Sequence, residues 1–221
     1  MFRIFGPPGT GKTTKLLDMV DRNLEAGVLP TNIAFLAFTR KAAEEARERA
    51  ASRFNLDPKN DLFFFKTLHS LALALTDIRT EQVMQPEHYK ELSKTIGVNL
   101  NAEQQNRFSD LPEAQKSSDP ILGLINLALL RKVPLREQYN ISRIEESWNV
   151  VKYVDEALTK YKQTYKLYDF TDMLRVFANT GETCCPRFAV TFLDEAQDLS
   201  PLQWDIAHML DRQSEKMYCA G

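Results

Sequence analysis

The feature that most constrains this chain is a glycine-rich segment, GPPGTGKT at residues 6–13, between a short apolar stretch and an amphipathic one. It matches the pattern G-x-x-x-x-G-K-[ST], the Walker A loop that joins a buried strand to a helix. Its glycines let the backbone curl so that successive amides point inward, and the helix N-terminus adds partial positive charge. The chain is therefore expected to be an α/β protein that binds a nucleotide.

The loop also predicts individual contacts. Lys12 is expected to reach the β- and γ-phosphates of ATP, and the Thr13 hydroxyl to ligate Mg²⁺. The expected nucleotide contacts are Gly6, Pro7, Pro8, Gly9, Thr10, Gly11, Lys12, Thr13 and Thr14. The alternative, a glycine-proline turn that only precedes a helix, fits such a full match poorly. The loop alone does not distinguish a kinase, a GTPase, a transporter ATPase and a helicase.

A second signal is an apolar segment at residues 190–193 that ends in two acids, Asp194 and Glu195. In an α/β sheet, the carboxyl ends of strands present catalytic groups beside the phosphate loop. Asp194 is expected to hold Mg²⁺, and Glu195 to orient and deprotonate the attacking water. By itself such an ending could be a solvated turn. Together with the phosphate loop it favours ATP hydrolysis.

The pattern along the chain predicts a parallel sheet with an all-helical insertion. Buried strands are expected at residues 3–5, 33–38, 62–65, 188–193 and 217–219, and helices at residues 11–23 and 41–54. From about residue 81 to 165 the strand signals give way to helical ones. One long helix is expected to carry an apolar stripe of Ile141, Ile144, Trp148, Val151, Val154, Leu158, Tyr161 and Tyr165. Residues 110–120 are expected to form a loop.

Composition excludes several classes of protein. The 28 basic and 30 acidic residues give a net charge of -2, so any nucleic-acid surface must be local. The 3 cysteines match neither a disulfide framework nor a zinc site, which favours a reducing cytoplasm. Met1 leaves no room for a signal peptide before the loop, and the apolar run at residues 121–130 is too short to span a bilayer. No membrane association is expected.

Further motifs occur in a fixed order along the chain. They are AFTRKAA at residues 37–43, TLHS at 67–70, DFTDML at 169–174, DEAQD at 194–198 and LSPLQW at 199–204. Together with the phosphate loop, these strings resemble the motifs of the UvrD/Rep group of superfamily 1 DNA helicases, enzymes of DNA repair and replication. The resemblance covers residues 6 to 204.

The resemblance implies a RecA-like P-loop NTPase domain 1A at residues 1–80 and 166–221, interrupted by helical domain 1B at residues 81–165. It implies ATP hydrolysis coupled to movement along single-stranded DNA, in the 3′ to 5′ direction. The implied catalytic residues are Glu195, Lys12 and Gln197. The implied DNA contacts are Phe38, Thr39, Arg40, Thr67, His69 and Ser70.

Alternatives stay open for some of these residues. Phe38 could be a core residue, Thr39 a helix cap, and His69 a structural histidine. Arg40 stands where the family usually has asparagine, and Thr14 where it often has arginine. The adenine-reading motif that the family carries upstream of the phosphate loop has no room before Gly6.

Residues 217–221 look like the strand that leads into the family's motif III. The resemblance therefore implies that a second RecA-like domain, 2A, is missing, with the arginines that it contributes to the ATP site. Such arginines can change phosphoryl-transfer rates by factors of about a thousand or more. The fragment is expected to bind nucleotide weakly and hydrolyse it poorly. Two rival interpretations are an RNA-directed helicase of the same superfamily and a non-hydrolysing nucleotide switch.

Overall fold

The structure is a computed structural model that describes residues 1–7, 9–101 and 119–221. Pro8, an expected nucleotide contact, and most of the expected loop at residues 110–120 lie outside this part. The chain forms two compact units, one of Met1–Thr76 with Val176–Gly221 and the other of Asp77–Arg175. The predicted domain boundaries lie at 80/81 and 165/166. Helix α8 (Phe170–Cys184) begins in the second unit and ends in the first.

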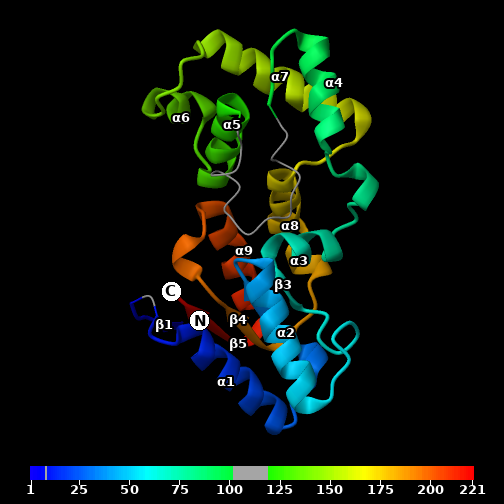
Figure 1. Ribbon diagram of the computed structural model, residues 1–221, viewed down its shortest axis with the longest axis vertical. Coiled ribbons are helices and arrows are strands. Elements are labelled where there is room, and N and C mark those ends of the chain that lie inside the picture. The colour runs from blue at the N-terminus through cyan, green and yellow to red at the C-terminus, as the bar shows by residue number, and fades with distance from the viewer. Residues whose placement is uncertain (8, 102–118) are drawn as a thin grey trace. The chain divides into compact units, whose positions relative to one another are not determined.

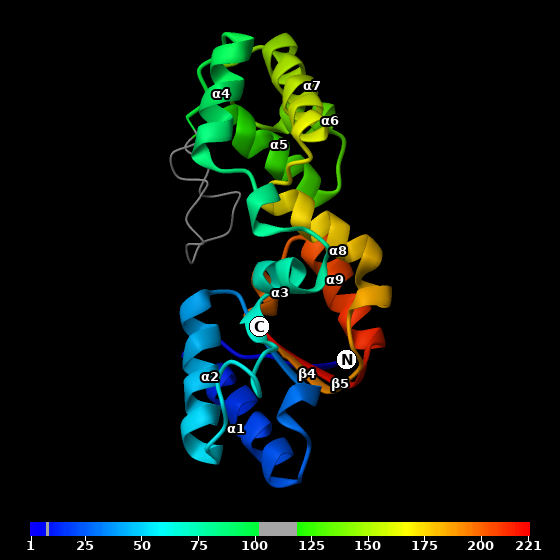
Figure 2. The ribbon, with the colours of Figure 1, turned by 90° about the vertical axis from the view of Figure 1, so that its right-hand side faces the viewer.

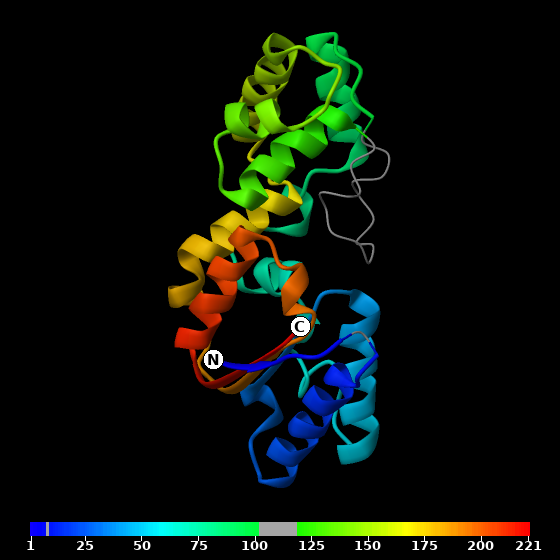
Figure 3. The ribbon, with the colours of Figure 1, turned by 90° about the vertical axis from the view of Figure 1, so that its left-hand side faces the viewer.

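The first unit is built on a parallel β-sheet (Figure 1). Its five strands lie in the order β1-β5-β4-β2-β3. Their bounds are β1 Phe2–Ile4, β2 Ile33–Ala37, β3 Phe65–Thr67, β4 Phe188–Leu193 and β5 Ser214–Ala220. The first and last strands in sequence lie side by side (Figure 3), with Ile4 in register with Ala220. This confirms the predicted α/β fold with a parallel sheet.

Helices cover both faces of this sheet (Figure 2). Helices α1 and α2 pack on one face, and α3 and α9 lie on the other. The helical elements of the unit are α1 Lys12–Glu25, η1 Pro30–Asn32, α2 Arg40–Phe54, α3 Leu68–Leu75, η4 Ala196–Asp198 and α9 Pro201–Arg212. The layered arrangement buries the inner strands β2 and β4, as is typical of parallel sheets, while the edge strand β1 is largely exposed.

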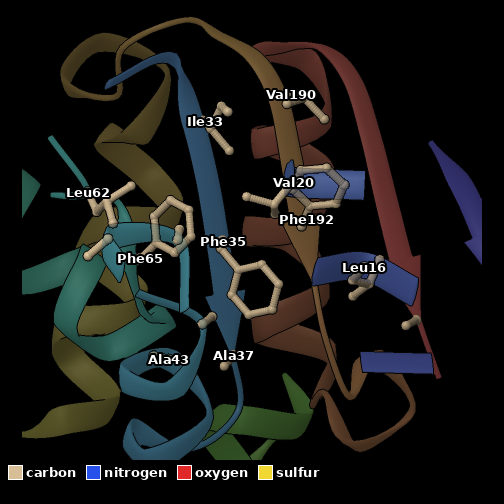
Figure 4. Packing of buried hydrophobic residues seen from close by; sticks show 14 residues of the cluster. Leu16, Val20, Ile33, Phe35, Ala37, Ala43, Leu62, Phe65, Val190 and Phe192 are labelled. Carbon is tan, nitrogen blue, oxygen red and sulfur yellow. The ribbon is translucent and has the colours of Figure 1, made fainter. Parts of the chain in front are cut away.

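The core beneath α1 and α2 is shown in Figure 4. Every residue of β2 is buried, so this strand is the centre of the packing. Phe35 of β2 stacks on Phe65 of β3, with ring centroids 5.8 Å apart, and Leu16 of α1 is buried in the same core. A buried strand with an uninterrupted apolar sequence is typical of a parallel sheet.

Among its described residues, the second unit is built mainly of helices, with one isolated parallel bridge between Val83 and Tyr168. The helices are η2 Thr80–Gln82, α4 Pro86–Ile96, α5 Pro120–Arg131, α6 Leu135–Ile141 and α7 Trp148–Tyr165. Val151, Val154 and Leu158 of α7 pack into its apolar core. At the end of α7 the Lys162 ammonium lies 2.6 Å from a carboxylate oxygen of Asp169 and 2.6 Å from one of Asp172. This ion pair network fixes the turn from α7 into α8.

Two local predictions were wrong. The strand expected at residues 62–65 is β3 at Phe65–Thr67, because only these residues pair with β2; Leu62 is buried without being in a strand. The long helix expected to start near Ile141 is interrupted: α6 ends at Ile141, and α7 begins at Trp148. Ile144 still packs on the core, although it lies in the loop between α6 and α7. The regular spacing of apolar residues therefore continues where the helix is interrupted.

None of the helices in the described ranges combines the length and the apolar character that crossing a bilayer requires.

Candidate nucleotide and nucleic-acid site

The phosphate loop connects β1 to α1 through two glycines in the left-handed conformation. Gly9 has φ 79°, and Gly11, the N-cap of α1, has φ 77°. A Cβ added to Gly6 would lie 2.6 Å from the Thr10 hydroxyl oxygen, which itself donates to the Pro7 carbonyl at 2.8 Å. The positive φ values favour glycine at positions 9 and 11, and at position 6 a side chain would crowd that of Thr10.

Lys12 is the first residue of α1, and its side chain folds back over the loop. Its ammonium donates to the carbonyl oxygen of Gly6 at 2.6 Å and to that of Pro7 at 3.3 Å. Gly11, the N-cap residue, has no side chain that could accept hydrogen bonds from the backbone amides in the first turn of α1. A full positive charge and a helix N-terminus therefore share one small region, an arrangement that suits an anion.

The loop and the acidic strand end meet through one short hydrogen bond. The Thr13 hydroxyl donates to the Asp194 carboxylate at 2.6 Å, although the two residues are 181 positions apart. Asp194 is only 3% exposed, and its backbone amide donates to the carbonyl of Leu36 in β2. Burial raises the pKa of Asp194, while the Thr13 hydroxyl, the Glu195 amide and the Lys12 charge act to lower it.

Glu195 follows Asp194 and is the N-cap of the short helix η4. Its φ of 53° and ψ of 39° lie in the left-handed region of backbone conformation, which residues other than glycine rarely adopt. The Gln197 side-chain amide donates to the Glu195 carboxylate and, at 3.1 Å, to that of Asp198. Unusual backbone geometry of this kind gathers at functional sites.

The sequence interpretation missed two residues next to Gln197. Asp198 shares the Gln197 amide with Glu195, and its place in the DEAQD string was the available signal. Gly221, at the end of β5, is so close that an added Cβ would lie 3.0 Å from the Gln197 backbone nitrogen. No local sequence pattern reveals that approach, because it depends on how β5 pairs with its neighbours.

The oxygens of Thr13 and Asp194 suit a divalent cation that takes few of its ligands from the protein. In the part of the chain that the structure describes, no three His, Cys, Asp or Glu residues form a group able to hold a metal ion. Thr13 and Asp194 instead supply two adjacent oxygens. Mg²⁺ commonly takes one or two protein oxygens and completes its shell with water and substrate phosphates.

The residues expected to contact DNA come together at one edge of the sheet. Ala37 at the end of β2 is in register with Thr67 at the end of β3. Phe38, Thr39 and Arg40 follow β2, and His69 and Ser70 follow Thr67, so the two short segments are neighbours at the carboxyl edge of the sheet.

Local hydrogen bonds already involve three of these side chains, those of Thr39, Thr67 and Ser70. The Thr39 hydroxyl oxygen accepts from the Ala42 amide at 3.1 Å and so caps α2. The Thr67 hydroxyl caps α3 by accepting from the Ser70 amide at 3.2 Å, and it donates to the Ser70 hydroxyl at 3.0 Å. The capping alternative considered for Thr39 is thus present. Phe38 and His69 are each partly exposed, and a DNA role for all six residues stays a prediction.

The comparisons with known proteins agree with these motifs. Residues 2–221 match the model of the UvrD/REP helicase N-terminal domain. The chain is 25% identical over 223 residues to the putative ATP-dependent DNA helicase YjcD of Bacillus subtilis, covering 96% of this chain and 29% of that protein. It is 24% identical over 231 residues to the ATP-dependent DNA helicase PcrA of Leuconostoc citreum, covering 99% of this chain and 30% of that protein. The chain thus spans less than a third of the length of these relatives, and it belongs to the UvrD/REP helicase N-terminal domain family.

Proposed function

We propose that this chain is the ATP-binding motor domain of a DNA helicase or translocase, in which ATP hydrolysis drives movement along single-stranded DNA. The observation that carries the proposal is the 2.6 Å contact between Thr13 and Asp194. It joins a phosphate loop to an acidic strand end, the pair of features that a magnesium-bound triphosphate requires. Family membership and the names of the relatives, both ATP-dependent DNA helicases, support the same conclusion.

In this proposal the loop holds the triphosphate. Lys12 would exchange its bonds to the Gly6 and Pro7 carbonyls for bonds to phosphate oxygens, while the amides at the start of α1 point at the same group. The other proposed contacts are Gly9, Thr10, Gly11, Thr13 and Thr14, with Pro8 as a further prediction from sequence.

Hydrolysis would depend on the acids at the end of β4. Thr13 and Asp194 are the proposed ligands of Mg²⁺, which when bound would neutralise charge on the phosphates. Glu195 would accept the proton of the attacking water. Gln197, whose amide contacts the Glu195 carboxylate, would hold that carboxylate and the water in position.

DNA would cross the carboxyl edge of the sheet near the ends of β2 and β3. Hydroxyls and amides at helix starts bind phosphates, and an aromatic ring offers a base a stacking surface. Phe38, Thr39, Arg40, Thr67, His69 and Ser70 are the proposed contacts. Arg40 would add an electrostatic contact where the family usually has asparagine.

The motor would need more than this domain. We propose that residues 1–80 and 166–221 act as domain 1A and residues 81–165 as domain 1B, opposite a second RecA-like domain, 2A, that completes the ATP site. Closing two such domains on ATP and reopening them after hydrolysis would move the DNA contacts, in the 3′ to 5′ direction. The 221-residue chain alone would turn ATP over poorly.

The test is ATP turnover by the protein at its natural full length, measured with and without oligo-dT. We expect strong stimulation by the DNA. Glu195→Gln should retain nucleotide binding and lose turnover, and the conservative change keeps the shape of the side chain. Stimulation by poly-U equal to that by oligo-dT would favour an RNA track. Undiminished turnover in Glu195→Gln would refute the assigned role of Glu195.

A further inference from the structure

A network of charged side chains joins α1 to α2 in the first unit. The Arg49 guanidinium donates to Asp18 at 2.6 Å and to Asp21 at 2.9 Å. The Arg53 guanidinium donates to Asp21 and, at 2.7 Å, to Glu25. The three acids come from α1 and the two arginines from α2, helices that lie side by side in Figures 1 and 2.

Asp21 is the member on which the network depends. Its side chain is 4% exposed, whereas those of Arg49 and Arg53 are 33% and 50% exposed. An exposed ion pair contributes little to stability, but a buried carboxylate without its partners is costly. Asp21 therefore ties the two helices to one relative position, in which both arginines reach it.

The apolar contact between these helices does not impose such a position by itself. The buried residues of α2 are alanines, among them Ala43, Ala46 and Ala50, and they belong to the same core cluster as Leu16 and Val20 of α1. Apolar burial is non-directional, so a smooth alanine surface tolerates sliding. Hydrogen bonds between arginine and carboxylate are directional. The charged network is thus the part of the interface that sets the helix register.

Both helices begin at the proposed sites. Helix α1 begins with Lys12 of the phosphate loop, and α2 begins at Arg40, just after its cap Thr39. Asp21 and Arg49 each lie nine positions beyond the first residue of their helix, or about 14 Å along it. Each helix follows a strand of the sheet through the segment at its start, and the network joins the two helices to each other farther along.

We propose that Asp21, Arg49 and Arg53 are positioning residues that couple the nucleotide loop to the DNA contacts at the start of α2. Because the network fixes the register between α1 and α2, the two helices move as one body. A displacement of the phosphate loop then also displaces Thr39 and Arg40, and a displacement of Thr39 and Arg40 also displaces the loop. This inference rests on the proposed function. It adds a mechanical link within the domain, made by residues that touch neither nucleotide nor DNA.

The experiment compares Asp21→Asn with the wild-type protein at its natural full length. ATP turnover is measured without DNA and with saturating oligo-dT. We expect basal turnover within about twofold of wild type and a stimulation factor reduced at least about fivefold, the lower end of common coupling between sites. Asp21→Glu, which keeps the charge, should restore part of the stimulation. A purely structural role would lower both rates in proportion.

The matched control is Glu182→Gln. Glu182 pairs with Arg212 at 2.7 Å, and the two exposed side chains join α8 to α9 within the first unit. This pair has no link to α1 or α2 in the proposal, so the stimulation factor of the control should equal that of wild type. A loss in the control as large as that in Asp21→Asn would overturn the specific role of the network.

The outcomes separate the two proposals. A wild-type enzyme that DNA does not stimulate overturns the proposed function, and the coupling with it. A stimulated wild type with an unchanged stimulation factor in Asp21→Asn overturns the coupling alone. If Asp21→Asn does not fold, Arg53→Gln is measured by the same criterion, because that side chain is half exposed. An unchanged factor in Arg53→Gln then overturns the coupling.

Discussion

The left-handed backbone conformation of Glu195 should lower the free energy of unfolding, and a pair of substitutions can measure by how much. Its φ of 53° and ψ of 39° are close to the centre of the left-handed region, which costs a residue with a Cβ roughly 1–2 kcal/mol. Glu195→Gly removes this cost, and Glu195→Ala keeps it. Both variants lose the contact with Gln197 equally, so their difference isolates the backbone. Glycine also loses more entropy on folding, by about 0.4–1 kcal/mol, which offsets part of the gain.

We therefore expect Glu195→Gly to be more stable than Glu195→Ala by about 0.5–1 kcal/mol. The assay is urea unfolding of the 221-residue chain, with the difference taken from the midpoints at a common slope. Both variants should lack ATP turnover in the protein at its natural full length. An alanine variant as stable as the glycine variant would refute the reasoning, because the left-handed turn would then cost no more than the entropy that glycine loses on folding.

Three further predictions follow from single contacts. Lys12→Ala should weaken binding of a fluorescent ATP analogue by about tenfold or more, since a charge-assisted bond is lost; unchanged affinity would contradict the role of Lys12. Ser200→Ala should lower the free energy of unfolding by about 1 kcal/mol, because Ser200 and Gln203 form the capping box of α9; an unchanged urea midpoint would argue against it. Burial raises the pKa of the Cys185 thiol to about 12, so iodoacetamide at about pH 8 should alkylate the more exposed Cys184 first, and equal rates would count against the burial of Cys185.

Much of the fold could be predicted because the relevant signals are local. The phosphate loop, the apolar strand that ends at Asp194 and the change to helical spacing after residue 81 are each read within a short window. The expected strand at residues 188–193 coincides with β4. The helix expected at residues 41–54 differs from α2 (Arg40–Phe54) by one residue at its start, where Thr39 supplies the cap.

The wrong predictions concern segments in which apolar residues are buried although they lie outside a strand or a helix. Leu62 and Ile144 are both apolar and packed inward, yet one lies outside β3 and the other between α6 and α7. Spacing along the sequence reports which side chains face a core. It does not report whether the backbone that carries them is a strand, a helix or a loop, because hydrogen-bonding partners decide that.

The sequence by itself determined the chemistry on offer: a lysine and a hydroxyl on a glycine-rich loop, and two acids after an apolar strand. Only the tertiary structure decided that Thr13 contacts Asp194, that Glu195 adopts the left-handed backbone conformation, and that Asp21 is buried and paired with two arginines. The physical reason is that residue types and short-range spacing are properties of the chain. Contacts across 181 positions depend on how the strands order themselves in the sheet and on which helices then pack together.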